Sequence, residues 1–154
     1  MVTSSVDIDA IAPATEDDSL NYIETIETVI SSLEQDQSAM VLHSGEEHLW
    51  KFAYGSVEVY VQLTGITDTD TLTVWAPVFP IPEPLKPALM QRLLEMNCME
   101  TLEACFGILG KDIVVLASRI LADISAGEIS RLMTIVATIA DDNDDALKSE
   151  FGIR

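Results

Sequence analysis

The stretch Trp50-Lys-Phe-Ala-Tyr-Gly-Ser-Val-Glu-Val-Tyr-Val-Gln-Leu63 decides the fold, because its apolar side chains recur at every second position. Such alternation is typical of β-strands with one buried face. The dipeptide Gly55-Ser56 interrupts it, and a two-residue loop that begins with glycine favours a tight hairpin because glycine accepts positive φ. Pairing Tyr54 with Val57 then places the large apolar side chains of both strands on one face.

Further elements are predicted on both sides of this hairpin. Apolar residues at three- and four-residue steps predict a helix over residues 19–33. A third strand is expected over residues 72–76, with Trp75 facing away from Leu72 and Val74, and Pro77 is expected to end it. The prolines lead into a second helix that Asn97 is expected to terminate. The inner stripe of this helix consists of Leu85, Leu89, Leu93 and Met96.

The C-terminal third predicts a second hairpin and a last helix. The hairpin comprises residues 102–108 and 113–119, and the box Ser125-Ala-Gly-Glu128 begins a helix whose buried stripe ends at Ala140. The acidic run 141–145 is expected to follow that helix. The order α-β-β-β-α-β-β-α predicts an α+β fold, a five-stranded, mainly antiparallel sheet with three helices on one face. Residues 1–17 are expected to form a disordered acidic tail and residues 18–154 a single domain.

Charge excludes several classes of partner. The 154 residues include 26 Asp and Glu but only 8 Lys and Arg, which gives a net charge of −18. The basic residues are scattered singly, so neither nucleic acid nor an anionic membrane surface is an expected partner. No apolar run approaches the roughly 20 residues that span a bilayer. The N-terminus lacks the features of a signal or transit peptide, and a cytoplasmic location is expected.

No constellation of residues predicts catalysis, a cofactor or a metal. Asp141, Asn143 and Asp145 match the start of a calcium loop, but the required glycine and closing glutamate are missing. Residues 107–112 are too short for a phosphate loop, and Asp68 and Asp70 lie in a predicted exposed loop that would not raise a carboxyl pKa. His43 and His48 would need a common surface and a third ligand to bind a metal, and Gly45 indicates an exposed turn. Cys98 and Cys105 are expected to be two buried thiols.

Apolar residues on the second face of the predicted sheet are the strongest functional signal. Helices on one side would leave this face uncovered, unless one helix crosses to it or the last hairpin pairs one residue out of register. Large exposed apolar patches usually mark interfaces. We therefore expect a protein interface, a homodimer and an unknown client protein. The expected interface residues are Tyr60, Trp75, Cys105, Val114 and Leu116.

Several segments resemble the YbjN-like bacterial family over about residues 20–152. They are residues 52–63, 76–80, 93–97, 106–108 and the pair Ala140-Asp141. This family is similar in fold to the type III secretion chaperones. The resemblance implies a small acidic homodimer that holds an extended segment of a client, and it supplies no active-site residue.

Three functions remain open from the sequence. The first is a non-catalytic, chaperone-like or regulatory protein-binding module. The second is a dedicated secretion chaperone for an effector. The third is an enzyme or small-ligand-binding protein with a pocket around Trp75, Tyr60 and the histidines.

Overall fold

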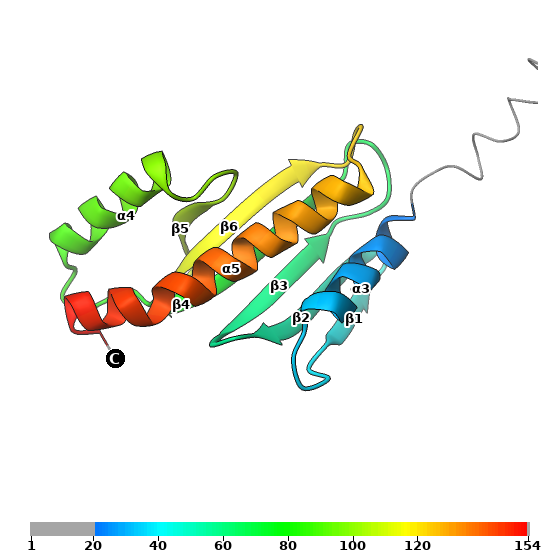
Figure 1. Cartoon of the computed structure of the whole chain (residues 1–154). Helices are drawn as coiled ribbons and strands as arrows, with labels where there is room; N and C mark the ends of the chain where they lie inside the picture. The colour runs from blue at the N-terminus through cyan, green and yellow to red at the C-terminus, as the bar shows by residue number, and fades with distance from the viewer. Residues whose placement is uncertain (1–20, 154) are drawn as a thin grey trace, which may run out of the picture.

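The computed structural model describes residues 21–153, so the predicted acidic tail lies outside the described residues. This part of the chain forms three helices and one six-stranded antiparallel sheet of order β1-β2-β3-β4-β6-β5 (Figure 1). None of these helices is long and apolar enough to cross a bilayer. The helices are α3 (Tyr22–Leu33), α4 (Pro87–Met99) and α5 (Ala126–Phe151). The strands are β1 (Met40–Ser44), β2 (Glu47–Tyr54), β3 (Val57–Leu63), β4 (Thr71–Pro80), β5 (Cys105–Leu109) and β6 (Asp112–Ile120).

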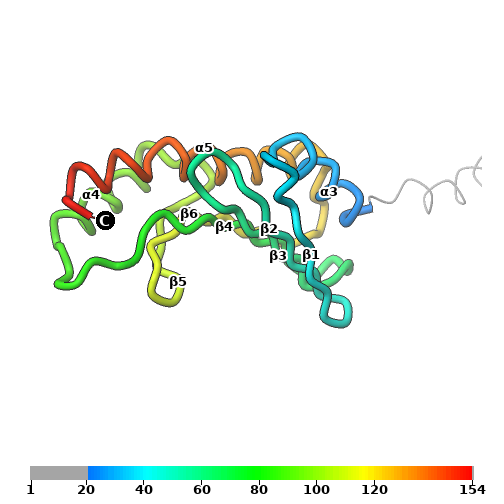
Figure 2. Tube along the Cα trace, turned by 90° about the horizontal axis from the view of Figure 1, so that it is seen from below, coloured from blue at the N-terminus to red at the C-terminus, as the bar shows by residue number. Residues whose placement is uncertain are grey.

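The helices all lie on one side of the sheet (Figure 2). Helix α5 runs along the middle of the sheet and packs on β4, β3 and β6, while α3 lies beside α5. Trp50 of β2 donates from Nε1 to Glu27 of α3 at 3.1 Å, which fixes α3 over that end of the sheet. Helix α4 packs against β5 at the other end. The α+β class and the one-sided arrangement of three helices are therefore confirmed.

The central hairpin has the predicted register, and α5 holds its turn. Tyr54 pairs with Val57, and Phe52 with Val59. The Ser56 N–H donates to Asp141 Oδ1 at 2.9 Å, and the Ser56 hydroxyl lies 2.8 Å from Oδ2 of the buried Asp144. The alternating sequence pattern predicted how the two strands pair. The polar contacts of Ser56 attach the turn between them to α5.

The sheet has six strands, so the prediction of five was wrong. The additional strand, β1, pairs with β2 through a turn at Gly45, whose φ of +63° suits glycine. All five residues of β1 are exposed. A short edge strand with no buried face lacks the alternation by which strands are recognised in a sequence.

Strand β4 and helix α5 extend well beyond their predicted ends because tertiary contacts override local signals. Strand β4 continues through Pro77 to Pro80, since its pairing with β3 ends at Trp75 and its register with β6 shifts just beyond Pro77. Edges and bulges tolerate proline. Helix α5 continues through the acidic run to Phe151, because Asp144 and Leu147 extend its buried stripe. It ends at Gly152, which has a left-handed φ of +64°.

Alanine substitutions at two glycines test the attachment of the central turn. Gly55 and Gly45 have similar positive φ values of +55° and +63°. A Cβ at Gly55 would overlap the Asp141 carboxylate, whereas one at Gly45 meets nothing within 4 Å. Gly45→Ala should cost about 1–2 kcal/mol of unfolding free energy from backbone strain alone. Gly55→Ala should cost about 2–4 kcal/mol, because the contacts of Asp141 are lost as well.

Urea denaturation of both variants measures this difference. Equal losses of unfolding free energy in Gly45→Ala and Gly55→Ala would contradict the anchoring role of Asp141.

Candidate functional site

The strand register aligns four of the expected interface residues in one row across the sheet. Tyr60 of β3 pairs with Trp75 of β4, Trp75 with Leu116 of β6, and Leu116 with Cys105 of β5. Directly opposite residues share a face, so all four side chains point to the same side. This side, here called the open face, is opposite the helices, and no helix of residues 21–153 covers it (Figure 2).

An aromatic stack forms the centre of the row. The rings of Tyr60 and Trp75 have centroids 5.3 Å apart and planes inclined by 8°. Lys51 of β2, the cross-strand partner of Tyr60, places Nζ 5.8 Å from the centre of the tyrosine ring. Both aromatic side chains are half-buried. Stacked, partly exposed Tyr and Trp combine apolar area with a polar edge, as in many protein interfaces.

Lys51 stays positively charged beside this stack. Its Nζ lies 3.1 Å from Glu58 Oε2, and Tyr60 Oη also donates to that oxygen at 3.3 Å. The pKa of Lys51 is raised, chiefly by the hydrogen bond to Glu58 and further by Tyr60. The charged end of the row is therefore a Lys–Glu pair that leaves one carboxylate and one ammonium at the surface.

Val114 supports the row instead of forming its surface. It is only 1% exposed, although no helix of the described chain lies on its side of the sheet. Its cross-strand neighbours are Pro77 and Gly107, and a Cβ at Gly107 would lie 2.8 Å from Leu116 Cδ2. The Leu116 side chain thus lies over Gly107, next to Val114. Leu116 itself is half-buried and remains available for contact.

Both thiols are exposed and free, so the prediction that they are buried was wrong. Cys105 is exposed on the open face of β5, where the edge strand has a neighbour on one side only. Cys98 lies on α4, outside the buried stripe of Leu89, Leu93 and Met96. An apolar neighbourhood in the sequence therefore did not imply burial in the fold.

Asn97 has a role that the sequence did not reveal. It does not terminate α4 but lies within the helix, which ends at Met99. Its Oδ1 accepts from the Phe106 N–H at 2.6 Å, and its Nδ2 donates to the Phe106 carbonyl at 3.1 Å. The Asn97 side chain thus satisfies the N–H and the carbonyl of Phe106 on the outer edge of β5. The only sequence signal was an amide residue two positions before the helix end.

Asp70, one of the two aspartates in the loop between β3 and β4, is held by hydrogen bonds within the loop. Asp70 accepts hydrogen bonds from Thr67 and Thr64. These bonds, first the one from the Thr67 hydroxyl, lower its pKa. Asp70 therefore stays ionised and organises the loop between β3 and β4.

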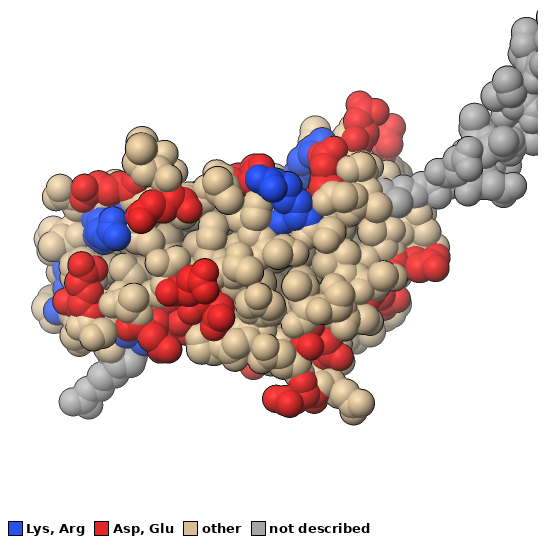
Figure 3. Space-filling view, in the orientation of Figure 1, with Lys and Arg blue, Asp and Glu red and all other residues tan. Residues whose placement is uncertain are grey.

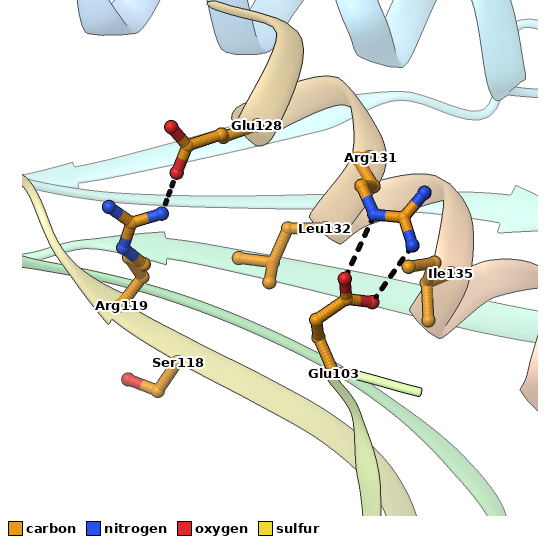
Figure 4. Close-up of a pocket in the computed structure, with 7 residues that line it drawn as sticks. All are labelled: Glu103, Ser118, Arg119, Glu128, Arg131, Leu132 and Ile135. Atoms are coloured by element: carbon orange, nitrogen blue, oxygen red, sulfur yellow. Dashed lines mark hydrogen bonds and ion pairs between the residues drawn. The ribbon is translucent and has the colours of Figure 1, made fainter. Parts of the chain in front are cut away.

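A cavity of about 150 Å³ lies between α5 and β6, and no sequence pattern indicated it (Figure 4). Arg131 binds Glu103 with two contacts of 3.0 and 3.4 Å, and Arg119 pairs with Glu128. The hydrogen bond from Arg131 lowers the pKa of Glu103. Each arginine is already neutralised by a carboxylate, so the cavity offers little attraction for an anionic ligand.

The fold and the open face together define an α+β protein with a one-sided, six-stranded antiparallel sheet. The chain belongs to the YbjN family, whose sequence profile matches residues 22–149 and carries the description "putative bacterial sensory transduction regulator". The match extends from the first residue of α3 almost to the end of α5. No curated protein matches the chain.

Aspartate substitutions distinguish the supporting from the contacting residue of the open face. Val114→Asp places a carboxylate at a position that is 1% exposed, and it should cost more than about 3 kcal/mol of unfolding free energy. Leu116→Asp should cost less because its carboxylate can reach water. Chemical denaturation followed by circular dichroism measures both. Equal destabilisation would show that Leu116 is as enclosed as Val114.

Proposed function

We propose that this protein is a non-catalytic, protein-binding regulator that acts as a homodimer and binds a segment of another protein in a chaperone-like manner. The observation that carries the proposal is the row of Tyr60, Trp75, Leu116 and Cys105 on the open face. The family description supports the regulatory part. The rest of the proposal depends on the chemistry of the row.

The row has the composition of a protein-contact surface. Full burial of a large apolar side chain gains about 1.5–3 kcal/mol, and half-buried side chains gain part of this. Trp and Tyr are also the residues that most often dominate binding energy in interfaces. A polar row lies beside the apolar one, where Thr73 and Ser118 share a hydrogen bond of 2.9 Å. An apolar strip with a polar border is typical of a binding surface.

Charge determines which part of the row suits a second copy. Each chain carries a net charge of −18, and carboxylates are widely spread over the helix-bearing side (Figure 3). Two copies therefore repel each other except where carboxylates are absent. The open-face neighbours of Leu116 are Trp75 and Cys105 across the sheet and Val114 and Ser118 along β6, all uncharged. The Leu116–Cys105 end thus suits the second copy.

The other end of the row suits the client segment. Tyr60 and Trp75 offer stacked rings, and the adjoining Lys51 and Glu58 offer one charge of each sign. An apolar segment with a polar flank would bury the rings and pair with these charges. Charge pairs of this kind at the edge of an interface favour correct docking more than affinity.

Light scattering at micromolar concentration tests the homodimer. The unmodified protein should give about twice the 16.8 kDa mass of one chain. Leu116→Asp should give the mass of one chain, because its carboxylate would be desolvated and repelled in the interface. Added salt should strengthen the dimer of the unmodified protein by screening the repulsion.

Ser149→Asp is the matched control, since it adds the same charge at an exposed position of α5 on the helix side. It should remain dimeric. A single-chain mass of the unmodified protein at every salt concentration would refute the dimer, and so would a dimer that Leu116→Asp leaves intact.

Site-specific photo-crosslinking in the native host tests client binding. A benzophenone amino acid replaces Tyr60 in one variant and Gln91, an exposed residue of α4, in the control. The Tyr60 position should give discrete adducts to another protein, and Trp75→Ala in the same chain should remove them because the indole ring that contacts the client is lost. Identical adducts from both positions would contradict binding at the open face.

A further inference from the structure

We infer that His43 and His48 form a two-imidazole binding site for a divalent transition-metal ion of the Cu²⁺, Ni²⁺ and Zn²⁺ class. The two residues are direct cross-strand partners in the β1–β2 hairpin. Their ring centroids are 4.3 Å apart, with planes inclined by 56°. This inference is independent of the proposed protein-binding role, since the histidines lie on the helix side of the sheet together with their neighbour Trp50.

The spacing of the two rings suits a shared ion. Imidazole nitrogens bind Zn²⁺ at about 2.0–2.1 Å, so two nitrogens on one ion are at most about 4 Å apart. Directly opposite residues in antiparallel strands have Cβ atoms about 4.5–5.5 Å apart. Small rotations of the side chains then bring one nitrogen of each ring to the same ion without movement of the backbone. The short turn at Gly45 fixes this register.

His48 is prepared to act as a ligand. Its Nδ1 lies 3.3 Å from the Glu46 carbonyl oxygen. A carbonyl only accepts hydrogen bonds, so the neutral tautomer that fits this contact carries its proton on Nδ1 and has the Nε2 electron pair free for a metal ion. Metal-binding histidines commonly donate their second N–H to a backbone carbonyl in this way. Trp50 stacks on the same ring, with centroids 5.3 Å apart and planes inclined by 18°, and thereby limits its rotation.

The surroundings favour a cation that arrives from solvent. His43 is exposed and His48 half-buried, and residues 40–50 contain Glu46 and Glu47 but no Lys or Arg. The nearest basic residue in sequence, Lys51, belongs to the row on the opposite face of the sheet. The net charge of −18 raises the concentration of cations near the surface.

Two protein ligands leave the remaining coordination positions to water. Within residues 21–153, no three His, Cys, Asp or Glu side chains gather into a metal-binding group. The hairpin supplies the common surface that His43 and His48 need, and water takes the place of a third protein ligand. Imidazole suits Cu, Ni and Zn, and tetragonal Cu²⁺ or Ni²⁺ accepts two nitrogens with water oxygens. Cu²⁺ binds most tightly among these ions, so it is the best probe.

A Cu²⁺ titration of tag-free protein with Cys98→Ser and Cys105→Ser tests the inference, because the two exposed thiols would otherwise react with Cu²⁺. The chain has two histidines and two tryptophans, so Trp75→Phe leaves Trp50 as the only tryptophan beside the site. Bound Cu²⁺ should quench Trp50 fluorescence with saturation at one ion per chain. Isothermal titration calorimetry, which does not depend on the fluorophore, should show at least tenfold weaker binding for His43→Ala and for His48→Ala.

Glu46→Gln and Glu47→Gln are the matched controls, because they remove a charge from the same hairpin and keep both imidazoles. They should change the affinity less than threefold. Unchanged Cu²⁺ affinity in either histidine variant would overturn the inference. A loss of binding in the glutamine variants equal to that in the histidine variants would also overturn it, because the ion would then be held by carboxylates. Circular dichroism verifies that each variant is folded.

Discussion

The placement of α5 is the constraint on which the rest of the structure depends. This 26-residue helix is fixed at its start, where the Glu128 N–H donates to Ser125 Oγ at 3.1 Å. It is fixed again in its second half by the contacts of Asp141 and Asp144 with Ser56. Because it covers β3, β4 and β6 between these two anchors, α5 defines which face of the sheet is buried.

One-sided cover has a direct chemical result on the other face. Apart from the enclosed Val114, the side chains of this face are in contact with water. Lys51, Glu58, Thr73 and Ser118 suit that environment, whereas Tyr60, Trp75 and Leu116 do so only in part. The apolar row is therefore not explained by the folding of this chain alone. Membership of a family described as a "putative bacterial sensory transduction regulator" is compatible with a contact surface for another protein.

Local sequence signals predicted the parts of the fold that local physics controls. Alternation and Gly55-Ser56 gave the central hairpin, Ser125 and Glu128 gave the start of α5, and Trp75 was placed on the outward face. The missed features depend on distant contacts. Strand β1 has no buried face, the acidic run stays helical because Ser56 binds its carboxylates, and Asn97 meets Phe106 only after α4 has packed on β5. The exposure of Cys105 follows from its place at a sheet edge.

The two hydrogen bonds between Asn97 and Phe106 make the two edges of the sheet unequal. At β5 the amide imitates a neighbouring strand, whereas β1 is the terminal strand at the opposite end and has no charged residue. Cross-β fibrils need two free edges per molecule to propagate. Because Asn97 already occupies the Phe106 backbone, a strand from another molecule would have to displace this amide to extend the sheet at β5, which limits strand addition at that edge.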